Sequence, residues 1–407
     1  MNMILTPTSD CFVMSLMANK RILFAHDGPL EVSPDGIPLE VHYSEALLQR
    51  YSQLGSKLTF LMRTKPLSAS EALKYSPLIR SGFSFQSVKD AKGPIKFACN
   101  AWSARKTVRT AVSKHDVVVA RLPSLIGSWA FMEARRQGIP VLVEFVACTW
   151  DCLWNLSKTG KLTAPYFFLK NKMLMRYSTH TIYVTEQFLQ SRYPSNQKFI
   201  ACSDVELISS SVEVINSRIN RISSYNNQRP IILTTVGAID VPFKGQATVI
   251  QALALMGKLG VRYKYRIVGQ GDSTRLLNIA RELGILPLIE FTGPVPHSDI
   301  VDILDNTDIY IQPSKTEGLP RALIEAMSRA CPALGSNVGG IPELLSSSRI
   351  FDKGDIHRLV EMLSCYSQDL MMHDAVQNWN TAKKYDKEVL AIRRAIFINE
   401  FLLDIDN

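Results

Sequence analysis

The feature that most constrains the fold of this chain is a repeated alternation of short apolar runs with amphipathic, helix-like segments. Arg21–Ala25 is an apolar run, His42–Leu54 has a helical pattern, and Leu58–Met62 is apolar again. Strand, helix and strand in that order predict a parallel α/β unit, because parallel strands need a crossover connection. The alternation continues to about Val184 and resumes at Ile231.

The length predicts more than one domain, because 407 residues exceed what one ordinary core holds. Between Val212 and Pro230 the sequence becomes rich in Asn, Ser and Arg, which is typical of a linker. We therefore predict two doubly wound, Rossmann-like α/β domains facing one another across a cleft, at residues 1–225 and 226–382, followed by a C-terminal helix in residues 383–407. Ligands of such sheets bind beyond the carboxyl ends of the strands.

The composition favours a cytoplasmic protein. The seven cysteines are odd in number and scattered, so we expect free thiols, including the pair Cys148 and Cys152. The first twenty residues lack the pattern of a signal peptide, and no apolar run is long enough to span a bilayer. The net charge of +9 is spread along the chain, which argues against a nucleic-acid partner. It suits an anionic diphosphate or an acidic membrane face.

The stretch Ile309–Glu343 contains the strongest candidate site. An apolar strand ends in a polar loop, and the turn Gly318-Leu319-Pro320 leads into a helix from about Arg321. The first amides of such a helix form an anion site. Glu317 and Glu325 lie eight positions apart, slightly more than two helical turns, so both carboxylates can face one side. The alternative is that both are solvated surface charges.

This stretch resembles a known family signature. The spacing Glu317-x7-Glu325, the Gly-Leu-Pro turn and the run Gly339–Glu343 are similar to the signature of retaining glycosyltransferases of the GT-B fold, called group 1 or family 4. The likeness is specific over about Ile231–Leu345. It implies that the last helix crosses back to the N-terminal domain. It also implies transfer of a sugar from a nucleotide-diphosphate donor to a glycan or polyprenyl-linked acceptor, in the synthesis of a capsule, O-antigen or exopolysaccharide.

The resemblance assigns the donor site. Glu325 is expected to bind ribose hydroxyls, Glu317 to face the transferred sugar, and Lys244 to hold the diphosphate. The family has an Arg where this chain has Ala238, and Arg321 is a candidate replacement. The expected donor-binding residues are Gly237, Lys244, Gly269, Gly271, Gly318, Leu319, Arg321, Ala322 and Glu325.

The expected catalytic residues are Glu317, Lys244 and Arg121. Arg121 stands where family members often have a His, and its guanidinium cannot act as a base because it stays charged. In the family the leaving phosphate is thought to accept the proton of the acceptor. Asp27, Trp150 and Asp151 are the candidates for acceptor binding, although a core position suits Trp150 equally well.

Neither a metal nor another cofactor is expected, because no Asp-x-Asp follows a strand and the His residues lack metal-ligand spacing. The basic, aromatic stretch Lys158–Arg176 predicts either peripheral membrane contact at the inner face of the membrane or a buried helix. Alternative functions are a sugar-nucleotide epimerase, a phosphorylase and a non-catalytic sugar-binding subunit of an assembly complex. A dinucleotide-dependent oxidoreductase is disfavoured, because Gly269-x-Gly271 lacks a third glycine.

Overall fold

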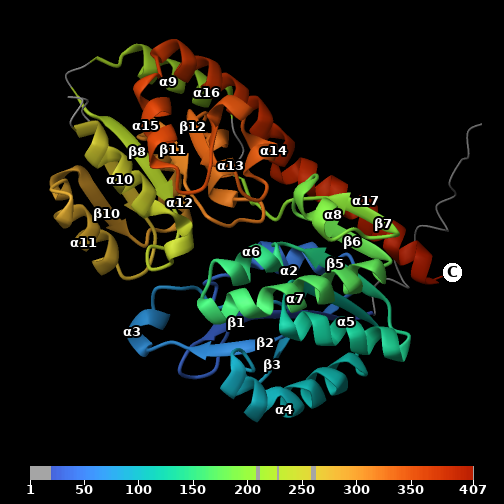
Figure 1. Cartoon of the computed structure of the whole chain (residues 1–407). Coiled ribbons are helices and arrows are strands. Elements are labelled where there is room, and N and C mark those ends of the chain that lie inside the picture. The colour runs from blue at the N-terminus through green and yellow to red at the C-terminus, as the bar shows by residue number, and fades with distance from the viewer. Residues whose placement is uncertain (1–19, 208–210, 227–228, 258–262, 407) are drawn as a thin grey trace, which may run out of the picture.

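The computed structural model describes residues 20–207, 211–226, 229–257 and 263–406. They form two α/β domains, each built on a parallel sheet, which lie one above the other in Figure 1. The predicted Rossmann-like architecture is confirmed for both halves, since each sheet alternates strands with helices in the order that the sequence pattern predicts.

The N-terminal sheet has seven strands in the order β3-β2-β1-β4-β5-β6-β7. Its strands are β1 (Arg21–Val32), β2 (Lys57–Pro66), β3 (Phe83–Ser87), β4 (Val117–Leu122), β5 (Val141–Phe145), β6 (His180–Tyr183) and β7 (Lys198–Ala201). Its helices are α2 (Glu45–Tyr51), α3 (Ala69–Ala72), α4 (Pro94–Val112), α5 (Leu125–Gln137), α6 (Thr149–Trp154), α7 (Lys158–Arg176) and α8 (Phe188–Arg192). The order reverses between β1 and β4, so the sheet has its switch point there, where a ligand edge is expected.

The C-terminal sheet has six strands in the order β10-β9-β8-β11-β12-β13. Its strands are β8 (Ile231–Val236), β9 (Tyr263–Val268), β10 (Ile289–Gly293), β11 (Ile309–Gln312), β12 (Ala333–Ser336) and β13 (Ile350–Phe351). Its helices are α9 (Val212–Ser223), α10 (Gln246–Met256), α11 (Thr274–Glu282), α12 (His297–Asp305), α13 (Arg321–Ser328), α14 (Ile341–Leu344), α15 (Ile356–Ser364) and α16 (Gln368–Ala382). The switch point lies between β8 and β11, the two strands whose loops carry Lys244 and Glu317.

The last helix, α17 (Lys387–Asp406), leaves the C-terminal domain and lies against the N-terminal sheet (Figure 1). Arg393 donates to the carbonyl of Ala201 and Arg394 to that of Ser203. Asp404 accepts from Lys198 at 2.7 Å. One hydrophobic core therefore runs from the N-terminal sheet through this helix into the second domain.

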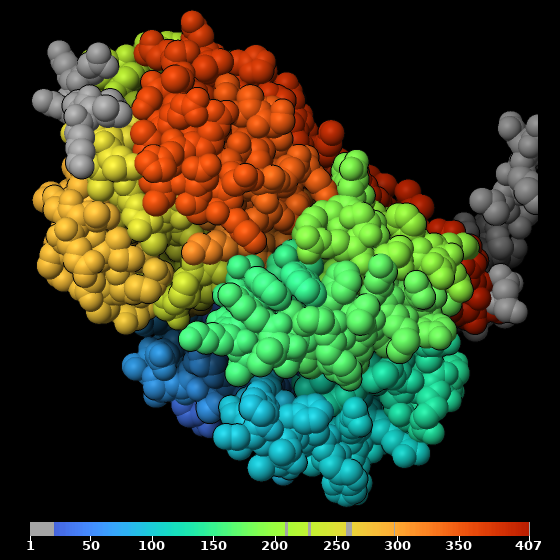
Figure 2. Space-filling model, viewed as in Figure 1, coloured from blue at the N-terminus to red at the C-terminus, as the bar shows by residue number. Residues whose placement is uncertain are grey.

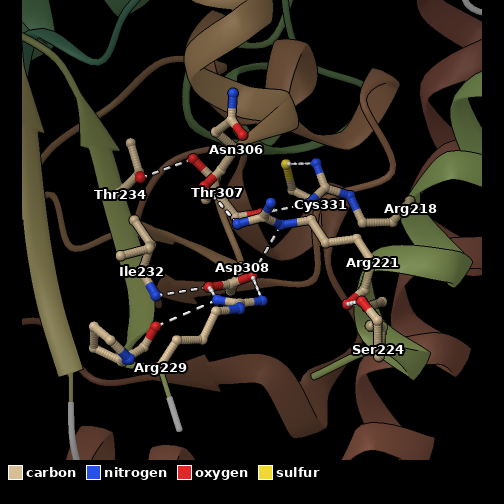
Figure 3. A network of polar contacts seen from close by, with 12 residues as sticks. Arg218, Arg221, Ser224, Arg229, Ile232, Thr234, Asn306, Thr307, Asp308 and Cys331 are labelled. Atoms are coloured by element: carbon tan, nitrogen blue, oxygen red, sulfur yellow. Dashed lines mark hydrogen bonds and ion pairs between the residues drawn. The ribbon is translucent and has the colours of Figure 1, made fainter. Parts of the chain in front are cut away.

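The linker prediction for Val212–Pro230 is wrong over most of its length, because Val212–Ser223 is helix α9. Its buried side chains Ile215 and Ile222 belong to the core of the C-terminal domain. Its buried Arg218 donates to the backbone carbonyls of Leu304 and Arg329 in that domain. It also donates to the Cys331 sulfur, as Figure 3 shows. The polar composition that suggested a linker is the exposed face of an amphipathic helix.

Asp308 fixes this helix and the strand that follows it to the second domain. Its carboxylate accepts from Arg221 at 3.0 Å, from Arg229 at 2.6 Å and from the amide of Ile232 at 2.8 Å (Figure 3). Burial disfavours the charged form of this carboxylate, but these donors outweigh burial and lower its pKa. The first residues of the C-terminal domain are therefore held by charge as well as by apolar packing.

Within the described residues, no helix combines the length and apolar character that crossing a bilayer requires.

Candidate active site

The loop between β11 and α13 lies at the contact between the two domains. A Cβ atom added to Gly318 would come within 2.1 Å of the carbonyl oxygen of Val146, a residue of the N-terminal domain. Asn155 of that domain donates from Nδ2 to the carbonyl of Lys315 at 3.3 Å. Glu317 sits between these contacts, so the structure places it at the domain junction and not on open surface.

The Glu317 carboxylate is held in one orientation by three donors. Its Oε1 accepts from Lys244 Nζ at 2.7 Å, from Ser314 Oγ at 2.7 Å and from Gln312 Nε2 at 3.1 Å. The Glu317 side chain is 11% exposed and that of Lys244 25% exposed. The predicted pair of Glu317 and Lys244 is thus brought together, although 73 residues separate them in sequence.

Glu325 lies half-buried on α13, within electrostatic reach of the same strand end. Burial raises the pKa of the Tyr310 phenol well above its usual range, and the charges of Glu325 and Glu317 add to this effect. The Tyr310 hydroxyl donates to Gln312, which in turn donates to Glu317. Glu317 is thus joined to Tyr310 through Gln312, and the charge of Glu325 acts on the same phenol.

The start of α13 is suited to an anion. Its N-cap residue is Pro320, and none of the side chains that the structure describes caps the helix. The first-turn amides, including those of Arg321 and Ala322, have no intrahelical acceptor and carry the positive end of the helix dipole. Leu319 is buried in the core and fixes the turn. The free amides and the ammonium group of Lys244, which is paired with Glu317, thus lie at the same loop, an arrangement that suits a phosphate.

The predicted glycines line the neighbouring strand ends. A Cβ atom at Gly237 would lie 3.7 Å from the Lys244 stem. Gly269 has φ +151°, and its Cβ would come 2.2 Å from the carbonyl oxygen of Gly237. Gly271 has φ +124°, and its Cβ would meet the Asp240 carboxylate at 2.5 Å. The loops after β8 and β9 therefore approach each other so closely that only glycine fits, and they do so beside Lys244.

Arg121 lies at the end of β4 in a buried ion-pair cluster. It donates to Glu144 Oε2 at 2.9 Å and to Asp204. Burial disfavours the charge of Asp204, but Arg121, Arg321 and Arg50 outweigh it, so the pKa of Asp204 lies well below its usual value. The charge of Arg321 on α13 therefore acts on a carboxylate of the N-terminal domain. Arg121 has partners within the chain, and its predicted catalytic role stays a prediction.

The three acceptor candidates also have partners within the N-terminal domain. Asp27 accepts from the amides of Leu125 and Ile126, both at 2.7 Å, and so caps α5. Asp151 pairs with Arg192 at 3.0 Å. Trp150 stacks on Trp154 with ring centroids 5.1 Å apart. Trp150 is half-buried and packs against the hydrophobic core, which favours its core interpretation. The two amides give Asp27 a structural role, and the acceptor roles of all three residues stay predictions.

The sequence reasoning did not single out Gln312, Ser314 or Asp204. Gln312 and Ser314 are buried polar residues that follow the apolar run of β11 directly, and this signal could have identified them. Asp204 gave no comparable signal, because it follows a short strand by several residues. Among the described residues, no group of three or more His, Cys, Asp or Glu side chains is arranged to hold a metal ion.

Comparison with known proteins places this geometry in a family. The model of the family "Glycosyl transferases group 1" matches residues 216–378, which include Lys244, Glu317 and Glu325. Protein CapJ of Staphylococcus aureus is 27% identical over 380 residues, with 92% of this chain and 94% of that protein covered. A putative colanic acid biosynthesis glycosyltransferase, WcaL of Escherichia coli K12, is 30% identical over 135 residues, which are 31% of this chain and 33% of WcaL.

Solved structures of glycosyltransferases share the fold. The crystal structure of Anabaena Alr3699/HepE in complex with UDP and glucose superposes with a TM-score of 0.64 at 15% identity, over 94% of this chain and 99% of that one. The family match covers the Glu317 site, and the structural likeness extends over the full length of the chain. Both agree with the two Rossmann-like domains described above. Residues 216–378 match the family of group 1 glycosyltransferases, and the chain has the GT-B fold.

Proposed function

We propose that this chain is a retaining glycosyltransferase of family 4 that moves a sugar from a nucleotide-diphosphate donor to a glycan or lipid-linked acceptor during polysaccharide synthesis. The observation that carries the proposal is the contact of Lys244 with Glu317 beside the uncapped start of α13. The relatives WcaL and AmsK, whose names place them in colanic acid and amylovoran biosynthesis, support the polysaccharide part of the proposal.

In this proposal the C-terminal domain holds the donor. The diphosphate lies against Lys244 and the first amides of α13, Glu325 accepts from ribose hydroxyls, and Glu317 accepts from a hydroxyl of the sugar. A uridine nucleotide is the first candidate, because the structural relative HepE binds UDP and glucose. When the diphosphate binds, the Lys244 ammonium group must contact both the phosphate and Glu317. The Glu317 carboxylate stays in place because it also accepts from Gln312 and Ser314.

The proposed reaction forms a bond between the acceptor oxygen and the anomeric carbon on the face from which the diphosphate leaves. The bond between that carbon and the diphosphate oxygen breaks, and the acceptor hydroxyl gives its proton to the departing diphosphate. Lys244 and the α13 amides stabilise the charge that develops on the leaving group, as preorganised donors do in other enzymes. We propose that this positive charge makes a metal ion unnecessary.

The test is a thermal-shift screen of the full chain against nucleotide-sugars, followed by turnover measurements with the ligand that stabilises it most. Membranes that contain polyprenyl-linked glycans serve as the acceptor. We expect release of nucleoside diphosphate only when donor and acceptor are both present, retention of anomeric configuration by NMR, and no loss of rate with EDTA. Glu317→Gln should bind donor yet turn over at least about 100-fold more slowly.

Two outcomes would contradict the proposal. Binding of a nucleotide-sugar without turnover on any acceptor would favour the non-catalytic subunit. Release of nucleoside diphosphate without any acceptor, at the full rate, would favour an epimerase-like or hydrolytic reaction.

A further inference from the structure

Helix α7 carries an apolar stripe that faces solvent. Its members follow one another at spacings of four, three and four residues, so they share one side of the helix: Leu162, Tyr166, Leu169 and Met173. All four are exposed, and Leu162 is 82% exposed. The opposite side of α7 packs on the domain through Ala164, Leu174 and Met175. The exposed stripe is therefore separate from the face with which α7 packs on the domain.

Helix α4 presents similar side chains on the same face of the domain. Helices α4, α5 and α7 lie side by side over the N-terminal sheet, and α4 and α7 are both visible on the face shown in Figure 2. Ile95 and Trp102 of α4 are exposed, Trp102 by 78%. Tryptophan at the edge of an apolar surface is typical of side chains that sit at a lipid–water boundary.

The charge on these two helices has one sign. Helices α4 and α7 contain nine Lys and Arg residues and no Asp or Glu: Lys96, Arg105, Lys106, Arg109, Lys158, Lys161, Lys170, Lys172 and Arg176. Helix α5 adds one acid, Glu133, which pairs with Arg136 at 2.5 Å. The surface is thus cationic as well as apolar.

A groove of about 650 Å³ opens between α4 and α5. Its walls include Trp102, Trp129, Arg105, Arg109 and Arg136. They also include one acid, Glu133, which lies 3.5 Å from Arg109 and 2.5 Å from Arg136, so the arginines outnumber it. Trp129 is 4% exposed, and its buried Nε1 has no hydrogen-bond acceptor among the described residues. Indole walls with guanidinium groups at the rim suit an anionic headgroup.

We propose that the exposed faces of α4 and α7, with the groove between α4 and α5, form a surface that docks on an anionic lipid bilayer. The apolar stripe enters the interfacial layer while the lysines and arginines meet lipid phosphates. A second copy of this chain does not fit, because two-fold pairing of the surface would bring nine cations against nine. This surface is distinct from the donor site and does not depend on the proposed reaction.

The surface begins beside the Glu317 loop. Asn155, three residues before α7, contacts the carbonyl of Lys315 at 3.3 Å. A bilayer lying on α7 would therefore meet the protein next to the domain junction. An acceptor carried by a lipid could then approach the junction without leaving the membrane.

Helix α17 provides a matched control. It also exposes an apolar stripe, with Ile392 at 63% and Ile396 at 65%, but its three cations are outnumbered by four acids. The experiment is co-sedimentation of the full chain with vesicles of phosphatidylcholine alone or mixed with phosphatidylglycerol, at two salt concentrations. The variants are Leu162→Gln/Leu169→Gln, Lys96→Gln/Lys106→Gln/Lys161→Gln, and the control Ile392→Gln/Ile396→Gln.

We expect binding to the anionic vesicles only, weakened by salt, with the α7 and lysine variants each losing at least about tenfold in partition. The α17 variant should bind as the parent does. All substituted side chains are exposed, so circular dichroism melts should coincide and exclude unfolding as a cause. Equal binding to neutral vesicles, equal loss in the α17 variant, or absence of vesicle binding would overturn the proposal. A parent dimer that becomes monomeric in the α7 variant would also overturn it and assign the surface to a second copy.

Discussion

Replacing Lys244 by methionine isolates the charge that we assign to diphosphate binding. The aliphatic stem packs beside Gly237, and methionine keeps most of that stem. In the free protein the substitution removes one partly exposed ion pair with Glu317, which contributes about 0–1 kcal/mol to the free energy of unfolding. In the complex it removes a charge-assisted hydrogen bond to phosphate, worth about 1.5–3 kcal/mol. The dissociation constant for nucleoside diphosphate should therefore rise about 10- to 150-fold.

Isothermal titration calorimetry with the nucleoside diphosphate that stabilises the parent measures this effect. Lys353→Met, at an exposed lysine of the same domain, is the matched control and should bind as the parent does. The double variant Lys244→Met/Glu317→Gln should bind more tightly than Lys244→Met alone, because the unpaired Glu317 charge no longer repels the phosphate. A folded Lys244→Met variant with the parent's dissociation constant would refute the reasoning.

Three further predictions concern the loops around the site. Gly269→Ala should lower the free energy of unfolding by about 1–3 kcal/mol in urea titrations, because φ is +151° and the new Cβ meets the Gly237 carbonyl. Gly257→Ala is the control and should be near neutral, because the space around this residue is open. Glu343→Gln should destabilise the contact between domains by about 1–2 kcal/mol, since its carboxylate accepts from three amides at the start of α8, and equal urea midpoints for variant and parent would contradict this. Burial, with the charges of Arg121 and Lys92, lowers the pKa of His26 to about 3, so NMR should find its imidazole neutral at pH 5. Because the folded-state pKa of His26 lies below the ordinary 6.5, the free energy of unfolding should fall as pH drops from 6.5 toward 3. The decrease is at most about 1.4 kcal/mol per pH unit, and a His26→Asn variant should lack this contribution.

The alternation of apolar runs and helical patterns was sufficient to predict the fold class, because a parallel sheet buries its strands on both faces. The elements with a weaker hydrophobic pattern were not predicted. β3 (Phe83–Ser87) and β7 (Lys198–Ala201) are edge strands with exposed polar residues, so they lack a continuous apolar run. Helix α9 was mistaken for a linker, because its buried face is narrow and includes the charged Arg218.

Some features of the candidate site could likewise be predicted from the sequence, and others could not. Glu317, Glu325 and the Gly-Leu-Pro turn are close in sequence, so spacing alone indicated a shared face. The contact of Lys244 with Glu317 joins two strand ends at the switch point, and the order of strands was needed to expect it. The partners of Arg121 depend on tertiary packing, because Asp204 comes from beyond β7 and meets Arg121 only in the folded domain. No local pattern in the sequence encodes that arrangement.

The proposed activity requires a sugar nucleotide to lie between Lys244, the start of α13 and the two carboxylates. A crystal structure of the full chain with the tightest-binding nucleotide-sugar measures this directly. We predict diphosphate oxygens within about 3 Å of Lys244 Nζ and of the Arg321 or Ala322 amide, with Glu325 on the ribose and Glu317 facing the sugar. Well-defined density for the ligand elsewhere, with Lys244 still paired to Glu317 and the α13 amides unengaged, would contradict the account.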